Sequence, residues 1–324
     1  MRRREFNSLV GGMLVWPLMA RAQQHKSRRI GFMWDSPTAF PDAMLAFRGA
    51  LREMGYVEGQ TMTIEYRYAE GDPERMRAFA EEFVRLEVDA IVAPSSIYTA
   101  AAKQATSAIP IIFMSHADPL GTGHVATLAR PGGNATGLSL MMTETNVKLL
   151  EIYKAAVPSL SRLAVVYDPS TPSHIPGLKA LEVAGPTLNV KIQPVPISAA
   201  NEYEQAFAAM IRDRAEAALF LSTPLYIGDA KRLADLARAN RIASLFGPRH
   251  NVVSGGLISY SPDRKDLWRR GAILLDRVLK GANPAELPVE QPTKFELVIN
   301  LATARTLGLK IPEAFLLRAD EVIE

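Results

Sequence analysis

The chain has 324 residues, with 37 Lys and Arg against 34 Asp and Glu, and it contains no cysteine. The lack of cysteine excludes disulfides, thiolate metal sites, a cysteine nucleophile and a lipidated cysteine tether. A chain of this length exceeds what one small hydrophobic core usually organises, so we expect two lobes.

Residues 1–22 have the layout of a secretory signal peptide. A basic head is followed by an uncharged, largely apolar run over residues 9–19, and the segment ends in Ala-Arg-Ala. As a helix that run rises only about 16 Å, too little to cross a hydrocarbon core of about 30 Å. The pair Arg3 and Arg4 resembles a twin-arginine export signal. We therefore expect cleavage after Ala22 and a periplasmic product.

The signal segment carries the whole positive excess of the chain. Removing residues 1–22 takes away four arginines and one glutamate, which leaves 33 basic and 33 acidic side chains. A neutral chain has no overall field with which to hold nucleic acid or an anionic membrane. No second apolar run approaches the length of about twenty residues that a spanning helix needs, so we expect that the mature chain does not span a membrane.

Short β-rich runs then alternate with helical patterns. Apolar residues recur at helical spacing from Met44 to Met54, where Gly55 ends the pattern, and Asp72-Pro73 has the form of a helix cap. Strands are predicted at 29–35, 62–68, 90–93 and 109–114, before, between and after these helices. This alternation predicts right-handed βαβ units and a parallel sheet.

The same pattern occurs twice. RIGFMWDSP from Arg29 is echoed by RLAVVYDPS from Arg162, and IPIIFMSHAD from Ile109 by IASLFGPRHN from Ile242; both pairs are 133 residues apart. VDAIVAPSS is matched by AEAALFLSTP at a similar separation, and TMTIEYRY more loosely by NVKIQPVPI. We therefore predict an α/β fold of two similar, doubly wound parallel-sheet lobes.

Polar, turn-forming loops follow the predicted strands of both halves. Six such loops begin near Asp35, Pro94, Ser115, Asp168, Ser222 and Gly247. One loop alone favours ordinary turn and cap chemistry. Six at equivalent strand ends favour a ligand cleft, because ligands of open parallel sheets bind outside the carboxyl ends of the strands.

Several motifs in order resemble the ABC-transporter substrate-binding protein family, which is similar in fold to exported tryptophan-binding proteins. They include MRRREF, RPGGNATGLS, GGLISYSPD and, most specifically, QPTKFELVINLATA. The resemblance implies a periplasmic-binding-protein type I fold with a three-crossing hinge near 137–143, 256–262 and 287–295. It implies a first lobe of 28–138 plus 263–288 and a second of 141–258 plus 292–324.

The resemblance also implies a monomer without cofactor or metal that is not an enzyme and that closes on one small ligand and passes it to a membrane permease. Hydroxyls and helix N-termini would hold a ligand carboxylate, and Asp118 or Asp168 an ammonium group. The candidate binding residues are Ser36, Ser95, Ser96, His116, Asp118, Asp168, Ser170, Thr223, Arg249 and Tyr260. Nearby aromatic residues that could contact an apolar body are Trp34, Tyr98, Tyr167, Tyr226 and Phe246. The sequences APSS and SHAD depart from the family pattern, so a relative's ligand does not transfer.

Other classes fit less well. Residues 121–126 match G-x-G-x-x-A, but they do not directly follow a strand, so we predict a plain helix start and not a dinucleotide site. The five histidines show no metal spacing, no G-x-S-x-G elbow is present, and residues 23–29 leave no room for a DNA-binding headpiece. A ligand-sensing partner of a membrane receptor, and less readily a periplasmic α/β enzyme, remain alternatives.

Overall fold

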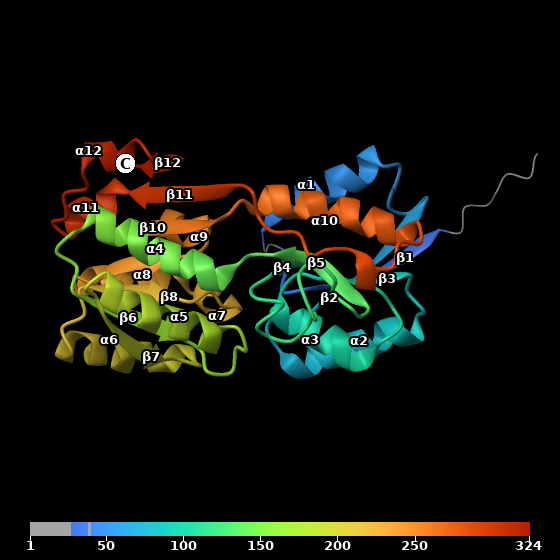
Figure 1. Ribbon diagram of the computed structural model, residues 1–324, viewed down its shortest axis with the longest axis horizontal. Coiled ribbons are helices and arrows are strands. Elements are labelled where there is room, and N and C mark those ends of the chain that lie inside the picture. The colour runs from blue at the N-terminus through green and yellow to red at the C-terminus, as the bar shows by residue number, and fades with distance from the viewer. Residues whose placement is uncertain (1–26, 38–39) are drawn as a thin grey trace, which may run out of the picture.

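The computed structural model describes residues 27–37 and 40–324. The predicted signal segment and its cleavage site lie outside the described residues. Figure 1 shows two α/β lobes side by side, each built on its own sheet. The predicted α/β architecture of two lobes is confirmed.

The first lobe has a five-stranded sheet in the order β2-β1-β3-β4-β5, and all of its neighbouring strands are parallel. Its strands are β1 (Arg28–Trp34), β2 (Met62–Tyr68), β3 (Ala90–Ala93), β4 (Ile111–His116) and β5 (Ala135–Ser139). Its helices are α1 (Pro41–Glu53), α2 (Pro73–Arg85), α3 (Ser96–Ala105) and α10 (Arg264–Leu279), which packs on α1 and β4. The 3₁₀ turn η2 spans Pro284–Glu286.

The second lobe has a seven-stranded sheet in the order β12-β11-β10-β9-β8-β6-β7, in which only the pair β10 and β11 is antiparallel. Its strands are β6 (Arg162–Tyr167), β7 (Lys191–Pro196), β8 (Ala217–Phe220), β9 (Ala243–Phe246), β10 (Ile258–Pro262), β11 (Phe295–Asn300) and β12 (Glu321–Ile323). Its helices are α4 (Met142–Ala156), α5 (His174–Thr187), α6 (Tyr203–Arg212), α7 (Pro224–Gly228), α8 (Ala230–Ala239), α9 (Arg249–Val253), α11 (Leu301–Thr306) and α12 (Glu313–Leu316), with the 3₁₀ turn η1 at Ala200–Glu202.

The predicted internal repeat is confirmed. The order β2-β1-β3-β4-β5 of the first sheet recurs in the second as β7-β6-β8-β9-β10. The echoed sequence segments form the equivalent strands β1 and β6, β3 and β8, and β4 and β9. The nearly constant separation of the echoed segments in the sequence therefore reflects one strand order that occurs in both sheets.

Each sheet is buried on both faces because successive side chains of a strand point to opposite sides. In β1, Ile30, Phe32 and Trp34 join the cluster that contains α1 and α10 residues, whereas Met33 joins the cluster on the α2 and α3 side. The Asp72 carboxylate caps α2 by accepting from the N–H groups of Glu74 and Arg75, as its Asp-Pro sequence predicts.

The chain passes between the lobes at three adjacent places. It leaves β5 for α4, leaves β10 for α10, and runs from η2 to β11. The three segments are joined by backbone hydrogen bonds: Ser139 N–H donates to Glu290 O at 2.9 Å, and Asp263 N–H donates to Lys294 O at 3.0 Å. We call these three segments together the crossing strands; they are β5 with the residues up to α4 (135–141), β10 with the residue before α10 (258–263), and residues 287–294 between η2 and β11.

Two local predictions are wrong. Strand β4 runs two residues beyond the predicted end at Met114, so Ser115 and His116 are buried strand residues and not loop residues. Residues 121–126 form turns and not a helix start. The Asp118 carboxylate accepts from the N–H of Gly121 at 2.7 Å and fixes this turn.

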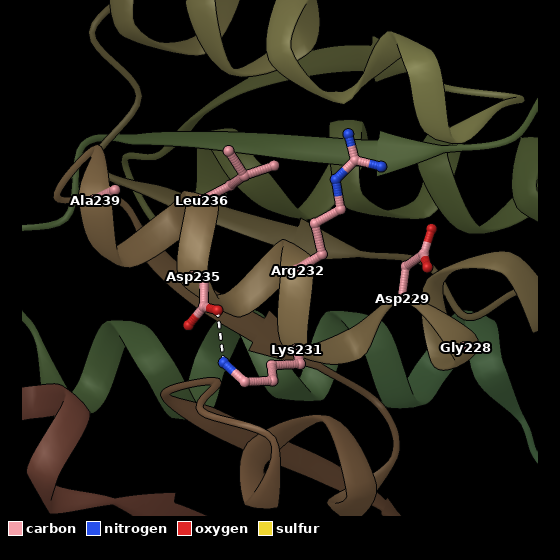
Figure 2. A pocket seen from close by; sticks show the side chains of 7 residues that line it. All are labelled: Gly228, Asp229, Lys231, Arg232, Asp235, Leu236 and Ala239. Carbon is pink, nitrogen blue, oxygen red and sulfur yellow. Dashed lines mark hydrogen bonds and ion pairs between the residues drawn. The ribbon is translucent and has the colours of Figure 1, made fainter.

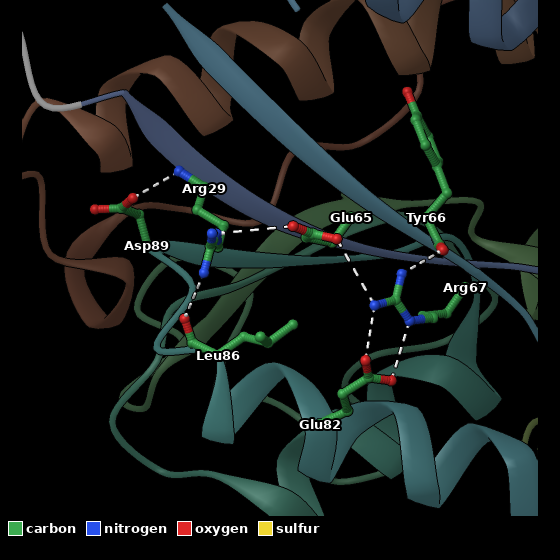
Figure 3. A network of polar contacts seen from close by, with 7 residues as sticks. All are labelled: Arg29, Glu65, Tyr66, Arg67, Glu82, Leu86 and Asp89. Carbon is green, nitrogen blue, oxygen red and sulfur yellow. Dashed lines mark hydrogen bonds and ion pairs between the residues drawn. The ribbon is translucent and has the colours of Figure 1, made fainter. Parts of the chain in front are cut away.

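A network of ion pairs fastens the outer edge of the first lobe. Figure 3 shows Glu65 between Arg29 and Arg67, which in turn forms two hydrogen bonds with Glu82 of α2, at 2.7 and 3.0 Å. Hydrogen bonding from Arg67 lowers the pKa of Glu82. The side chains of Arg67 and Glu82 are 26% and 33% exposed, so solvent screens the pair.

Glu82→Ala is therefore expected to lower the free energy of unfolding by only about 1 kcal/mol. Urea denaturation at low and high salt measures it, and salt should reduce the difference. The neighbouring Glu81→Ala is the control, because Glu81 is exposed and has no ion-pair partner among the residues described. A loss of several kcal/mol would show that the network supports the lobe far more than its exposure indicates.

Candidate functional site

The carboxyl ends of the parallel strands of each lobe face the other lobe. In Figure 1, β4 and β5 point toward the second lobe, and α7, which follows β8, lies on the side facing the first. This is where open parallel sheets place their ligands. Within residues 27–37 and 40–324, no helix is long and apolar enough to cross a membrane, and no group of His, Asp or Glu is arranged to hold a metal ion.

On the first lobe, a hydrogen-bonded chain joins Ser96 at the start of α3, His116 at the end of β4 and His124 in the turns that follow. The Oγ of Ser96 lies 3.2 Å from Nδ1 of His116, whose Nε2 lies 2.7 Å from Nδ1 of His124. Ser96 Oγ also accepts from the N–H of Ala117 at 3.0 Å. Burial lowers the pKa of His116 far below its usual value, and burial also lowers that of His124. Both rings are therefore neutral at pH 7. Each of the two contacts is then a single hydrogen bond, with one nitrogen or oxygen as donor and the other as acceptor.

Other predicted residues of this wall lie at the ends of β1 and β3. Tyr98, 2% exposed, donates from its hydroxyl to Asp35 Oδ1 at 3.3 Å, and burial raises its pKa. Ser95 precedes α3, and its buried Oγ has no hydrogen-bond partner among the described residues. Ser36 is partly exposed, two residues past the end of β1. Of the serines on this wall, Ser95 is the one whose buried hydroxyl lacks a partner among the described residues.

On the second lobe, Asp168 and His174 hold the loop after β6. Oδ1 of Asp168 accepts from the N–H of Ser170 at 2.9 Å, from the Ser170 hydroxyl at 2.8 Å and from the Ser198 hydroxyl at 3.2 Å. Nδ1 of His174 accepts from the N–H of Asp168 at 3.0 Å, which places the ring proton on Nε2, 3.3 Å from the carbonyl of Ser222. These bonds occupy the carboxylate and hydroxyl that the sequence assigned to a ligand.

The remaining predicted residues of the second wall also have partners. Thr223 Oγ1 accepts from the N–H of Tyr226 at 3.1 Å and caps α7. Arg249 forms a double ion pair with Glu321, which raises the pKa of Arg249, and the charge of Asp42 in the first lobe adds to the effect. Tyr260 stacks on Phe295 with ring centroids 5.3 Å apart.

Among the predicted aromatic contacts, most rings are core residues. Tyr226 is 1% exposed and donates to Ile197 O at 2.6 Å, and Phe246 stacks on Phe220 at 4.8 Å. Tyr167 packs against the second-lobe core. Trp34 is also buried, but its indole N–H has no hydrogen-bond partner among the described residues. Of these four residues, Trp34 is the one at a strand end whose donor is both buried and unpaired among the described residues.

The two walls approach each other beside the crossing strands. Leu140 N–H donates to His116 O at 2.7 Å and Met142 N–H donates to Ala117 O at 3.0 Å, which ties the start of α4 to the end of β4. A Cβ atom on Gly247 would lie 2.9 Å from Ser222 Oγ and 3.5 Å from Met142 Cε. The ends of β8 and β9 therefore lie close to the first crossing.

Buried polar atoms without partners concentrate in this region. Buried polar groups of proteins are nearly always hydrogen-bonded, so each exception needs a reason. Of the unpaired buried side-chain atoms in the described residues, five lie at strand ends or where a crossing strand enters a helix: Trp34 Nε1, Ser95 Oγ, Thr143 Oγ1, Ser222 Oγ and Arg264 Nε. The other two, Asn251 Oδ1 and Ser259 Oγ, lie in α9 and β10.

Sequence reasoning did not select Thr143, Ser222 or Arg264 as binding residues. Ser222 stands in one of the predicted polar loops and could have been found there. Arg264 follows the N-cap Asp263, whose carboxylate accepts from Lys265 N–H at 2.8 Å, so its position reads as the exposed first turn of a helix. Only the packing of distant segments reveals that its Nε is buried.

A separate groove on the second lobe lies along α8, away from the strand ends. Its lining, shown in Figure 2, consists of Gly228, Asp229, Lys231, Arg232, Asp235, Leu236 and Ala239. Lys231 pairs with Asp235 at 2.7 Å and Arg232 with Glu204 at 2.8 Å. Its cations are therefore already neutralised, and the strand ends are the better candidate site.

Comparison with known proteins bears on family and fold, and the similar solved structures show the predicted periplasmic-binding-protein type I fold. The sequence model of the ABC transporter substrate binding protein family matches residues 39–323. A tyrosine-binding protein of Clostridioides difficile is 27% identical over 268 residues, which cover 83% of this chain and 77% of that protein. Two solved structures are each 24% identical and cover 92% of this chain and 100% of theirs. They are a conserved domain protein of Vibrio cholerae, with a TM-score of 0.85, and a Streptococcus pneumonia ABC domain in complex with L-Trp, with a TM-score of 0.84.

Proposed function

The chain belongs to the family of ABC transporter substrate-binding proteins, and we propose that its two lobes close on one small amino acid or aromatic carboxylate and deliver it to a membrane permease. The observation that carries this proposal is the set of five unpaired buried polar atoms, three at strand ends and two at the starts of the helices that follow the crossings. A ligand with a carboxylate and an ammonium group would satisfy such atoms. One similar protein is named tyrosine-binding and another was solved with L-Trp, so aromatic amino acids are the first ligands to test, although APSS and SHAD in this chain depart from the family pattern.

Closure would use the crossing strands as a hinge. We propose that residues 28–138 plus 263–288 move as one lobe and residues 141–258 plus 292–324 as the other. A ligand that contacts both walls stabilises the closed state through contacts that the open state lacks. Of the predicted binding residues, Ser95, Ser96 and His116 are proposed to serve the first wall. Asp168, Ser170 and Thr223 would shape the second wall through the bonds that they already make.

We also propose that the chain is exported and works in the periplasm as a monomer. Residues 1–22 carry a basic head, a short apolar run and small residues before the expected cleavage after Ala22. Folding before export, which the twin-arginine route requires, suits a chain with two long-range parallel sheets.

A ligand screen tests the function. The full chain is titrated with L-tryptophan, L-tyrosine, L-phenylalanine, L-leucine and the corresponding aromatic acids, and its thermal unfolding is followed. A true ligand at a hundredfold excess over its Kd is expected to stabilise the protein by about 2.7 kcal/mol. Absence of any shift across the panel, together with turnover of a substrate, would contradict the proposal and favour an enzyme.

A further inference from the structure

Arg264, the first residue of α10, has a partly buried guanidinium group that forms no ion pair with any described residue. Its Nε is buried and has no hydrogen-bond partner among the described residues, although the residue as a whole is partly exposed. Its guanidinium lies over the ring of Phe40, with Cζ 4.4 Å from the ring centroid. Burial lowers the pKa of Arg264 to about 10, and no charged neighbour offsets this loss of solvation.

Other arginines of the chain show how unusual this is. Arg269 and Arg270 on the same helix pair with Glu53 at 2.7 Å and with Glu290 at 2.6 Å. In contrast, none of the ion pairs between described residues includes Arg264, although Asp263 and Asp266 lie beside it in sequence. An unpaired, desolvated cation is costly, and a cation–π contact recovers only part of that cost. An anion bound to Arg264 would offset that cost.

The surroundings of Arg264 indicate what kind of anion fits. Trp268, one helical turn further along α10, contacts Trp34 edge to face with ring centroids 4.7 Å apart. Phe40, Trp34 and Trp268 belong to one apolar cluster. The Trp268 N–H is used, because it donates to Ser115 Oγ at 2.9 Å, whereas the Trp34 N–H is not. A buried positive charge, a free indole donor and an aromatic surround suit a carboxylate on an aromatic or apolar body better than a phosphate or a sugar.

We propose that Arg264 binds the carboxylate of the transported ligand, with the Trp34 indole N–H as a second donor and Phe40 holding the guanidinium plane. The inference rests on the proposed function and deepens it, because it assigns the ligand class to organic carboxylates with an aromatic or apolar body. Arg264 begins α10 directly after a crossing strand. Binding there would place the ligand's carboxylate beside the proposed hinge, about which the two lobes would move on closure.

The test compares two amino acids with the corresponding amines, which lack the carboxylate. Wild type, Arg264→Gln and Arg264→Lys are titrated by calorimetry with L-tryptophan and L-tyrosine, and with tryptamine and tyramine, which lack the carboxylate. Arg264→Gln is expected to weaken binding of the two amino acids on the order of 100-fold, because a charge-assisted hydrogen bond is lost. Arg264→Lys should fall between, since it keeps the charge but not the planar fork. The amines should bind the wild type and Arg264→Gln equally weakly. Arg277→Gln, an exposed arginine of α10, is the control and should change nothing.

Stability of the ligand-free protein separates binding from a structural role. Removing a desolvated cation that serves only the ligand should leave the unfolding midpoint of Arg264→Gln unchanged or higher. A lower midpoint with unchanged amino-acid affinity would make Arg264 structural and overturn the inference. If Arg264→Gln bound the amino acids with the same affinity as the wild type, the inference would be overturned, but the proposed function would stand. A wild-type protein that binds none of the amino acids would contradict the proposed function, and with it this site.

Discussion

Gly137→Ala is expected to lower the free energy of unfolding by about 4 kcal/mol or more, which places it among the most damaging single changes. Gly137 of β5 pairs with Phe113 of β4. A Cβ on Gly137 would lie only 2.0 Å from the carbonyl oxygen of Phe113 and 2.5 Å from its ring. Because one of the two atoms belongs to the backbone, the clash cannot be relieved by a rotamer change. Strand β5 would have to leave the sheet, and its carbonyl would lose the N–H of Glu290 on another crossing strand.

Urea denaturation of Gly137→Ala beside Gly49→Ala measures this. Gly49 lies inside α1, and a Cβ there meets no atom within 4 Å. Alanine should stabilise that helix by about 0.5 to 1 kcal/mol, so the same substitution acts in opposite directions at the two sites. If Gly137→Ala kept the wild-type midpoint, the close approach of β4 and β5 beside the hinge would be wrong.

The architecture was predictable because local sequence and burial agree along most of the chain. Strands buried on both faces need continuous apolar runs, and the polar turns after them are visible in the sequence as well. The separation of 133 residues between the two halves then predicted one strand order used twice. The end of β4 was missed because Ser115 and His116 look like loop residues. Their partners Trp268 and Ser96 are distant in sequence, so only the folded chain shows that both are paired and buried.

The sequence predicted where a site could lie, but it did not predict which side chains would be available to a ligand. Parallel topology predicted where polar loops would gather, and Ser95, a predicted binding residue, has a buried hydroxyl without a partner among the described residues. Which groups are already used depends on short-range geometry that the residue types do not reveal. The Asp168 carboxylate, for example, already accepts hydrogen bonds from the Ser170 and Ser198 hydroxyls. The proposed role of Arg264 was not predicted, because its contact with Phe40 joins segments far apart in sequence.

Stability is expected to fall as the pH drops from 6.5 toward 4, largely through buried histidines. Burial lowers the pKa of His174 to about 4 in the folded protein, against about 6.5 in an unfolded chain. Between these values the unfolded state binds the proton and the folded state does not, so each step downward in pH favours unfolding. The full difference is worth about 3 kcal/mol, and below pH 4 His174 adds no further loss. Burial lowers the pKa values of His116 and His124 too, so both act in the same direction.

His174→Asn isolates this contribution, because the asparagine oxygen can replace Nδ1 as acceptor for the N–H of Asp168 but cannot take up a proton. The free energy of unfolding is measured in urea at pH 7.5 and pH 5 for the wild type, His174→Asn and the exposed-site control His250→Asn. The wild type and control should lose stability between the two pH values, and His174→Asn should lose about 2 kcal/mol less. Its stability at pH 7.5 is lower because the smaller side chain leaves a cavity, so the pH difference within each variant is the decisive quantity. An equal fall in all three would mean that His174 is not held neutral, and that the loop after β6 does not depend on its hydrogen bond to Asp168.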